Sequence, residues 1–239
     1  MDRTELRISA KDLGAMALQD FCLSCFWLKL RMANKLPFQI FPGIFSSIDA
    51  YTKRVVHSWF DKNGNQPAWL SELGTFSGYI DPPHYTKFAI VDQEHGIKLW
   101  GTPDGILKCA DGSLCIVDYK TAKFTGNQDT LFPMYEIQLN VYARIAEELN
   151  HGKVSKLALI YMEPVTEVTR NGEGIYLTNG FAMNFLAHII EVQRNPTRIG
   201  PLLETLRKIH EMAASPDGKD NCDNCELLEK MAGFWNKAA

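Results

Sequence analysis

The stretch GTPDGILKCADGSLCIVDYK, residues 101–120 of a 239-residue chain, decides the fold. Within it, Asp111-Gly112 separates two apolar runs, Gly105 to Cys109 and Leu114 to Val117. A short Asp-Gly break between such runs is a strong signal for a β-hairpin. A helix is expected next, from Pro133 to Asn150, because proline suits a first helical turn. The stretch therefore predicts a hairpin followed by a helix.

The loop length of this hairpin decides which polar side chains meet. A two-residue loop sets Asp104 opposite Tyr119. A three-residue loop, with Gly112 left-handed and forming a bulge, sets Asp104 opposite Asp118 instead. Because side chains alternate along a strand, Lys120 then shares one face with both carboxylates, and Tyr119 points the other way. We favour the three-residue loop.

Two opposed carboxylates suggest a metal site. Their Cβ atoms would lie roughly 4.5–5.5 Å apart, so they repel each other unless a cation neutralises them. Oxygen ligands favour Mg²⁺ or Mn²⁺, and Mg²⁺ typically uses one or two protein carboxylates together with waters and substrate oxygens. A neighbouring lysine can orient or help deprotonate the attacking water. The alternative for Asp118 and Lys120 is an exposed strand face with a solvated ion pair.

Three motifs in this region resemble those of a known family. They are Gly101-x-Pro-Asp104, Asp118-x-Lys120 and Gln138-x-x-x-Tyr142. Their order, spacing and element type resemble the PD-(D/E)XK nucleases, specifically the RecB-type branch that includes the CRISPR-associated iron–sulfur exonucleases and the AddB nuclease domain. An acidic-x-Lys triplet alone is weak evidence, since Asp217-Gly-Lys219 also fits.

The resemblance implies a role for each residue of these motifs. The metal ligands would be Asp104, Asp118 and the Tyr119 carbonyl, and the other catalytic residues would be Lys120, Gln138 and Tyr142. The i, i+4 spacing of Gln138 and Tyr142 independently puts them on one helical face. RecB-type enzymes often carry a metal-binding histidine on a helix ahead of the sheet, which makes His57 a further candidate ligand. A lone helical histidine is more often structural, and that alternative stays open.

Four of the six cysteines form two C-x2-C pairs, Cys22 with Cys25 and Cys222 with Cys225. Such pairs are typical of a four-thiolate metal site. Zn²⁺ and a [4Fe–4S] cluster both accept four thiolates, and the spacing does not separate them. The resemblance favours the cluster, although iron–sulfur members of the branch typically supply one cysteine from the N-terminal segment and three from the C-terminal one. The site would be structural and would join both ends of the fold.

The other two cysteines, Cys109 and Cys115, lie in the hairpin. In the favoured register they are diagonal neighbours roughly 7–8 Å apart, which is too far for an unstrained disulfide. We interpret them as core thiols.

Apolar residues on both hairpin faces predict a sheet covered by helices on both sides. With the resemblance, this indicates an α/β fold with a restriction-endonuclease-like mixed sheet flanked by helices. We expect one nuclease domain over residues 1–239, with a catalytic core at 86–163 and a cysteine clamp formed by 1–36 and 215–239.

The remaining elements follow from periodicity and punctuation. A helix capped by Ser9 should run through Phe21 and carry the first cysteine pair, and a second helix should run from Ser46 through Trp59. Gln66 to Tyr85 reads as an irregular loop. The other predicted elements are strands Phe88–Val91, Ile97–Trp100 (continuing into the hairpin), Lys156–Met162, Ile175–Leu177 and Leu186–Val192, a helix Pro201–Met212 and a short closing helix.

Composition limits the classes of partner. The formal net charge is −3 and the pI is near 6.1, so nothing global indicates nucleic-acid binding. Contacts to DNA must then come from local cations, and the candidates are Lys29, Arg31, Lys35, Lys53, Arg54, Lys120 and Lys123. No apolar run approaches the roughly 20 residues that span a bilayer, and no signal peptide is evident. We expect a soluble, cytoplasmic protein without a membrane partner.

The leading functional hypothesis is a metal-dependent deoxyribonuclease, an exonuclease acting on single strands or ends in DNA repair, recombination or CRISPR-type adaptation, with protein partners in such a complex. The rival is a non-catalytic nucleic-acid-binding or assembly module of the same fold. A third hypothesis is an RNA-processing nuclease, because the motif reads a phosphodiester and not a sugar.

Overall fold

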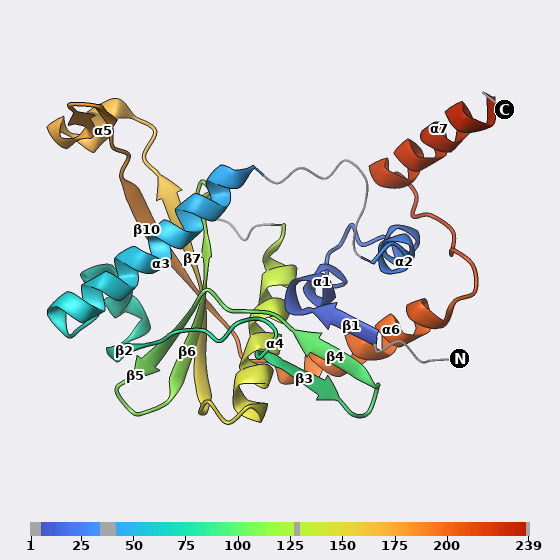
Figure 1. Ribbon diagram of the computed structural model, residues 1–239, viewed down its shortest axis with the longest axis horizontal. Helices are drawn as coiled ribbons and strands as arrows, with labels where there is room; N and C mark the ends of the chain where they lie inside the picture. Colours follow the sequence, from blue (N-terminus) through green and yellow to red (C-terminus); the bar gives the residue numbers. More distant parts are fainter. Residues whose placement is uncertain (1–5, 34–41, 127–129, 238–239) are drawn as a thin grey trace.

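The computed structural model describes residues 6–33, 42–126 and 130–237. Its centre is a five-stranded sheet in the order β10-β7-β6-β5-β2 (Figure 1). The strands are β2 (Phe76–Ile80), β5 (Gly105–Cys109), β6 (Leu114–Lys120), β7 (Val154–Pro164) and β10 (Phe185–Val192). β6 and β7 are parallel, and the other neighbours are antiparallel. The predicted mixed α/β sheet is therefore confirmed.

The β5–β6 hairpin has the three-residue loop. Gly112 has a φ of 83°, which is the left-handed conformation that the bulge requires. The ladder pairs Gly105 with Val117, so the next positions outward are Asp104 and Asp118. The favoured register is confirmed.

Helices cover both faces of the sheet, as predicted. Helix α4 (Phe132–Glu148) packs on one face, against Ile106, Leu114 and Ile116. The other face packs on residues of helix α3 (Gly43–Asn63) and the 3₁₀ helix η1 (Ala68–Leu73), and its buried hairpin residues are Leu107, Cys109, Cys115 and Val117. The interpretation of Cys109 and Cys115 as core thiols is confirmed.

A second sheet of three strands, in the order β1-β4-β3, lies beside α4 (Figure 1). It consists of β1 (Leu6–Ser9), β3 (Ala89–Asp92) and β4 (Ile97–Trp100), and β1 was not expected. The antiparallel β3–β4 pair is confirmed, but the prediction that β4 continues into the hairpin is wrong. Pro103 lacks a backbone N–H, so the run from β4 to β5 breaks and the two strands join different sheets.

The N-terminal helix is also divided. Helix α1 (Ala10–Ala15) begins as predicted, with the Ser9 hydroxyl accepting the Asp12 N–H at 3.0 Å. It ends at Ala15, and a separate helix α2 (Leu23–Arg31) begins after Cys22. The prediction of one helix through Phe21 is wrong, because two short helices joined by turns satisfy the same apolar spacing.

The remaining elements match the sequence in part. The prediction of an irregular loop at Gln66–Tyr85 is wrong, because η1 and β2 form within it. β2 is an edge strand with a register shift at Gly78, and this irregularity hid the alternating pattern of a strand in the sequence. The predicted strand at Leu186–Val192 and the helix near Pro201–Met212 are confirmed as β10 and α6. The other elements are α5 (Val168–Asn171), η2 (Glu173–Ile175), β8 (Tyr176–Leu177), β9 (Gly180–Phe181), η3 (Pro196–Arg198), α6 (Ile199–Glu211) and α7 (Asp223–Lys237).

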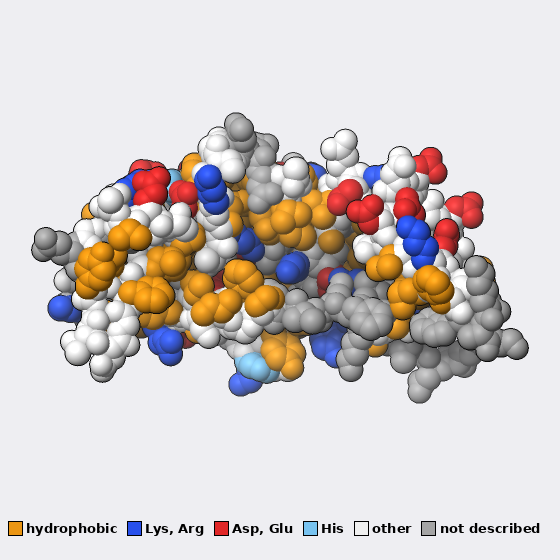
Figure 2. Space-filling view, turned by 90° about the horizontal axis from the view of Figure 1, so that it is seen from above, with side chains coloured by type: hydrophobic (Ala, Val, Ile, Leu, Met, Phe, Trp, Pro, Cys, Tyr) orange, Lys and Arg blue, Asp and Glu red, His pale blue; other side chains and the backbone are white. Residues whose placement is uncertain are grey.

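Figure 2 views the molecule from the top of Figure 1. Hydrophobic side chains gather on one half of this face, and basic and acidic side chains lie in a hollow near its middle. The exposed apolar residues of α3 and of the β8–β9 hairpin include Tyr51, Val55, Trp59, Tyr176, Leu177 and Phe181. Within the described ranges, none of the helices combines the length and apolar character that a bilayer crossing requires.

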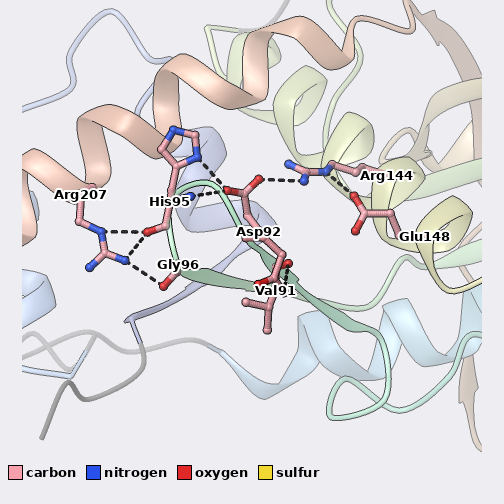
Figure 3. Close-up of polar contacts among 8 residues, drawn as sticks. Val91, Asp92, His95, Gly96, Arg144, Glu148 and Arg207 are labelled. Atoms are coloured by element: carbon pink, nitrogen blue, oxygen red, sulfur yellow. Dashed lines mark hydrogen bonds and ion pairs between the residues drawn. The ribbon is translucent and has the colours of Figure 1, made fainter.

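A charged network fixes the turn between β3 and β4 to two helices (Figure 3). The buried Asp92 carboxylate accepts the His95 N–H at 2.9 Å, contacts the His95 ring at 2.8 Å and pairs with Arg144 of α4 at 2.8 Å. Arg144 also pairs with Glu148, and Arg207 of α6 donates to the backbone carbonyls of the turn. The second sheet is thereby tied to α4, the helix that follows β6.

Candidate active site and four-cysteine centre

The paired carboxylates lie where β5 begins and β6 ends. Asp104 directly precedes β5, and Asp104 Oδ2 accepts the Tyr119 N–H at 2.8 Å. Asp118 lies in β6 and is only 3% exposed. Burial, and then the neighbouring Asp104 carboxylate, raise the pKa of Asp118 to about 7, although Lys120 opposes the shift. The hairpin therefore holds two carboxylates that repel each other in a poorly solvated place.

Lys120 and Gln138 surround the buried carboxylate. Lys120 Nζ pairs with Asp118 Oδ2 and lies 4.2 Å from the centre of the Tyr135 ring. From α4, Gln138 Nε2 donates to Asp118 Oδ1 at 3.3 Å and to the Tyr142 hydroxyl at 3.0 Å. The structure thus brings together the strand and helix residues that the sequence singled out.

Tyr142 explains the glycine of the first motif. A Cβ at Gly101 would lie 2.5 Å from Tyr142 Cε1, so any larger residue would displace the ring. The ring is 5% exposed, and burial raises the pKa of its hydroxyl. Gly101 and Tyr142 therefore act as a packed support behind Gln138.

Helix α3 contributes two charged residues that the motifs did not include. Lys53 Nζ lies 2.8 Å from Asp104 Oδ1 and 2.8 Å from Asp49 Oδ2. From the sequence, Lys53 was only a candidate DNA contact, and nothing distinguished Asp49. Their i, i+4 spacing was visible, but nothing in the sequence showed that α3 would approach the hairpin at this turn.

His57 lies one turn further along α3. Its ring stacks on Tyr79 with centroids 3.8 Å apart, and its Nδ1 is 3.5 Å from Asp81 Oδ1. Burial lowers its pKa, which favours the neutral imidazole. These contacts indicate a packing role, and metal ligation by His57 stays a prediction. Lys35, another candidate DNA contact, lies outside the described residues.

The residues of this site fit a hard divalent cation. Among the described residues, Asp118 Oδ2 and Gln138 Oε1 are buried without a hydrogen-bond partner, although Asp118 Oδ2 has its ion pair with Lys120. Buried oxygen atoms in this condition suit a ligand that accepts their lone pairs. Mg²⁺ usually takes one or two carboxylates from a protein, and this site offers two.

A comparison with family models agrees with this arrangement. Residues 44–229 match the model of the PD-(D/E)XK nuclease superfamily, which is most of the chain. The chain belongs to the PD-(D/E)XK nuclease superfamily. Members of this superfamily are usually metal-dependent nucleases that use divalent ions. The matched range includes Asp104, Asp118 and Lys120 as well as α3 and the second cysteine pair.

Two other comparisons add little to the superfamily assignment. A search of curated proteins finds no match. A solved structure titled "Crystal structure of SSO0001" has 12% sequence identity and a TM-score of 0.41, over 90% of this chain and 82% of that chain.

The four predicted cysteines meet at one point. Their Sγ atoms all lie within 4.8 Å of one another, as predicted for a clamp between the two ends of the fold. Individual Sγ–Sγ distances are 3.5 Å for Cys22–Cys225, 3.6 Å for Cys25–Cys222 and 3.4 Å for Cys25–Cys225. Each pair lies at the N-terminal end of a helix, Cys22 and Cys25 at α2 and Cys222 and Cys225 at α7 (Figure 1).

Backbone groups around the cluster favour a thiolate at Cys22. Burial opposes its ionisation, but N–H groups of Cys25 and Lys219 and the adjacent thiols lower the pKa of Cys22 to about 6. Burial and the neighbouring thiols raise the pKa of Cys25. A metal ion would stabilise four thiols held this close together, because it binds their deprotonated form and neutralises the repulsion between several thiolates.

Proposed function

We propose that this protein is a Mg²⁺- or Mn²⁺-dependent deoxyribonuclease, an exonuclease that acts on single strands or ends. The observation that supports this most strongly is the meeting of Asp104, Asp118 and Lys120 at one end of the β5–β6 hairpin in a chain of the nuclease superfamily. Gln138 on the adjacent helix supports it further. The RecB-type branch and a place in DNA repair, recombination or CRISPR-type adaptation are part of the same proposal.

Each residue has a role that follows from its surroundings. Asp104 and Asp118 would hold the divalent ion, with the Tyr119 carbonyl as a further ligand. The ion would supply charge neutralisation at the phosphate and acidify a water molecule. Lys120 pairs with Asp118 through a compact ammonium, which can orient the attacking water and stabilise the phosphoryl oxygens. Gln138 would fix the orientation of Asp118, and Tyr142 would fix Gln138.

The rest of the molecule supports a nucleic-acid substrate only locally. Because the net charge is negative, phosphate contacts must come from a few cations near the site. The hollow in Figure 2 contains basic and acidic side chains beside apolar ones. Its basic side chains suit the charged backbone of an unstacked single strand, and the apolar ones suit its exposed bases.

We further propose that the four cysteines hold a structural metal. The resemblance to iron–sulfur nucleases favours [4Fe–4S]. The sulfur separations favour one tetrahedral ion such as Zn²⁺, for which Zn–S bonds of about 2.3 Å place the sulfur atoms about 3.8 Å apart. A [4Fe–4S] cube, with one iron at each thiolate, holds them farther apart. Metal analysis and colour separate the two, since a cluster is brown and zinc is colourless.

The nuclease proposal is tested with labelled single- and double-stranded DNA and RNA, with and without Mn²⁺. Asp118→Ala and Lys120→Ala should each lower the cleavage rate at least about 10³-fold, because both residues handle the ion and the water. Asp104→Asn should lose cleavage and also bind Mn²⁺ more weakly by calorimetry. Lys208→Ala, an exposed lysine of α6, is the matched control and should cleave normally.

Each competing function predicts a different result. Near wild-type cleavage by either alanine variant would contradict the site assignment. Binding of DNA without any metal-dependent cleavage would favour the non-catalytic module, and cleavage of RNA alone would favour the RNA-processing enzyme.

A further inference from the structure

Lys53 forms an ion pair with Asp104, one of the two carboxylates that would bind the divalent ion. Lys53 Nζ contacts Asp104 Oδ1 at 2.8 Å, and Asp104 Oδ2 already accepts the Tyr119 N–H. Both oxygens of Asp104 are therefore engaged. An ion shared with Asp118 must compete with the Lys53 ammonium for Asp104.

The formal charges around the hairpin make this competition strong. Asp49, Asp104 and Asp118 carry three negative charges, and Lys53 and Lys120 carry two positive ones. One negative charge is left over, which attracts a cation but does not balance a divalent one. An ammonium and a divalent ion on the same carboxylate would also repel each other at close range, in surroundings of low effective dielectric.

The Lys53 side chain also has room to move away from Asp104. Its side chain is 29% exposed, and Asp49, one turn earlier on α3, holds its Nζ independently of Asp104. Four flexible methylene groups allow the ammonium to turn away from Asp104 while it stays near the site. An ammonium at the edge of a phosphodiester-cleaving site meets substrate phosphates.

We propose that Lys53 is an exchangeable cation. It neutralises Asp104 in the metal-free protein, leaves that carboxylate when the divalent ion binds, and then contacts a backbone phosphate of the nucleic-acid strand. This rests on the proposed function for the identity of the phosphate, but the exchange itself concerns only the ion.

The first test is Mn²⁺ affinity, measured by calorimetry on the full chain. Lys53→Met removes the competitor, so we expect Mn²⁺ to bind at least about threefold more tightly than in the wild type. A purely structural lysine predicts the opposite, because without it Asp104 would lose its position. Lys62→Met removes one exposed positive charge from the same helix and should leave the affinity unchanged. Lys53→Gln, which keeps a hydrogen-bond donor, replaces the methionine variant if that variant does not fold.

The second test is strand binding, measured by fluorescence anisotropy with a single-stranded phosphorothioate oligonucleotide that resists cleavage. With Mn²⁺ present, Lys53→Met should bind more weakly than the wild type, and the slope of log K against log salt should shrink by about 0.7, the value for one phosphate contact on a single strand. Without Mn²⁺ the two proteins should bind almost equally, because Lys53 is then held by Asp104.

The outcomes separate this proposal from the nuclease proposal. Unchanged or weaker Mn²⁺ affinity in both Lys53 variants overturns cation exchange, whatever the wild type cleaves. A loss of strand affinity that is the same with and without Mn²⁺ also overturns it. If Lys53→Met shows the expected changes in Mn²⁺ affinity and strand binding but the wild type cleaves no nucleic acid, the nuclease function is overturned and the exchange stays supported.

Discussion

At the scale of single residues, opposing effects on charge meet at the Asp118 carboxylate. It is buried beside a second carboxylate, with Lys120 and Gln138 as its partners. Burial disfavours the charged form of the carboxylate, whereas the lysine favours it. A divalent ion would relieve the repulsion between the two carboxylates, and the metal-free arrangement is therefore a compromise between folding and function.

The raised pKa of Asp118, about 7, predicts how metal binding depends on pH. An ion binds only the deprotonated carboxylate, so Mn²⁺ affinity should rise up to about tenfold per pH unit below pH 7 and level off above it. Calorimetry between pH 5.5 and pH 8.5 measures this. A flat profile would show that Asp118 is already ionised throughout, and Asp118→Asn should bind weakly with no such rise.

At the scale of elements, the sequence predicts the parts of the site that share one hairpin or one helix. The Asp-Gly turn determines the register that opposes Asp104 and Asp118, and the i, i+4 spacing puts Gln138 and Tyr142 on one face. The approach of α3 could not be predicted, because it depends on packing against η1 and β2, in a segment whose glycines and prolines resemble a loop. The ion pairs that Lys53 makes with Asp49 and Asp104 were missed for this reason.

The second sheet was missed for a related reason. β1 has only four residues and pairs in parallel with β4, from which it is separated by most of the N-terminal half of the chain. Short strands with distant partners leave no local pattern. The β3–β4 turn was visible, but its links to two helices were not (Figure 3). Asp92 pairs with Arg144 of α4, and Arg207 of α6 donates to backbone carbonyls of the turn, and neither arginine is nearby in sequence.

The network around Asp92 predicts sensitivity to acid. Burial opposes ionisation, but hydrogen bonds from the His95 N–H, the His95 ring and Arg144 prevail and lower the pKa of Asp92. A lowered pKa means stabilisation that is present above the unfolded-state value of about 3.9 and is lost as the pH falls through the folded-state value. Asp92→Asn should therefore lower the free energy of unfolding by about 1–3 kcal/mol at pH 6.

Urea denaturation at pH 6, 5, 4 and 3 checks this prediction. The gap between wild type and Asp92→Asn should be constant from pH 6 to pH 5 and should narrow below about pH 4. Glu204→Gln, which removes an exposed carboxylate paired with Lys208, is the control and should leave the free energy of unfolding almost unchanged at every pH. A gap that does not change with pH would mean that the charge of Asp92 is unimportant.

At the scale of the whole molecule, the cysteine cluster joins residues about 200 positions apart in sequence. Other contacts also join the N-terminal and C-terminal segments. Arg31 donates to the Met212 carbonyl at 2.7 Å, and Trp27 donates to it at 3.1 Å. The side chains of Ser24 and Ser215 lie 3.0 Å apart. The thiols therefore lie in a docked interface between α2 and the C-terminal segment, which makes their proximity a property of the fold.

Loss of this cluster should destabilise the whole protein. Cys25→Ser or Cys222→Ser should lower the free energy of unfolding by at least about 3 kcal/mol, because a bound metal contributes its binding energy only to the folded state. Cys109→Ser, in the core and 3.9 Å from the Ser155 hydroxyl, should cost about 1 kcal/mol. Thermal unfolding with and without a chelator provides the measurement. Equal losses in all three variants, or a preparation with neither iron nor zinc, would contradict a metal clamp.

The distance along the chain between the two cysteine pairs also has a consequence during protein synthesis. Domains fold as the chain emerges, beginning with the N-terminal part, so β1, α1 and α4 can assemble long before Cys222 is made. Until then Cys22 and Cys25 are two nucleophilic thiols without their partners, open to oxidation or to a mistaken metal. All four thiols are available to the proposed metal only after Cys222 and Cys225 have been made. The metal supply at that moment, more than its total amount, should determine how much of the protein acquires a complete site.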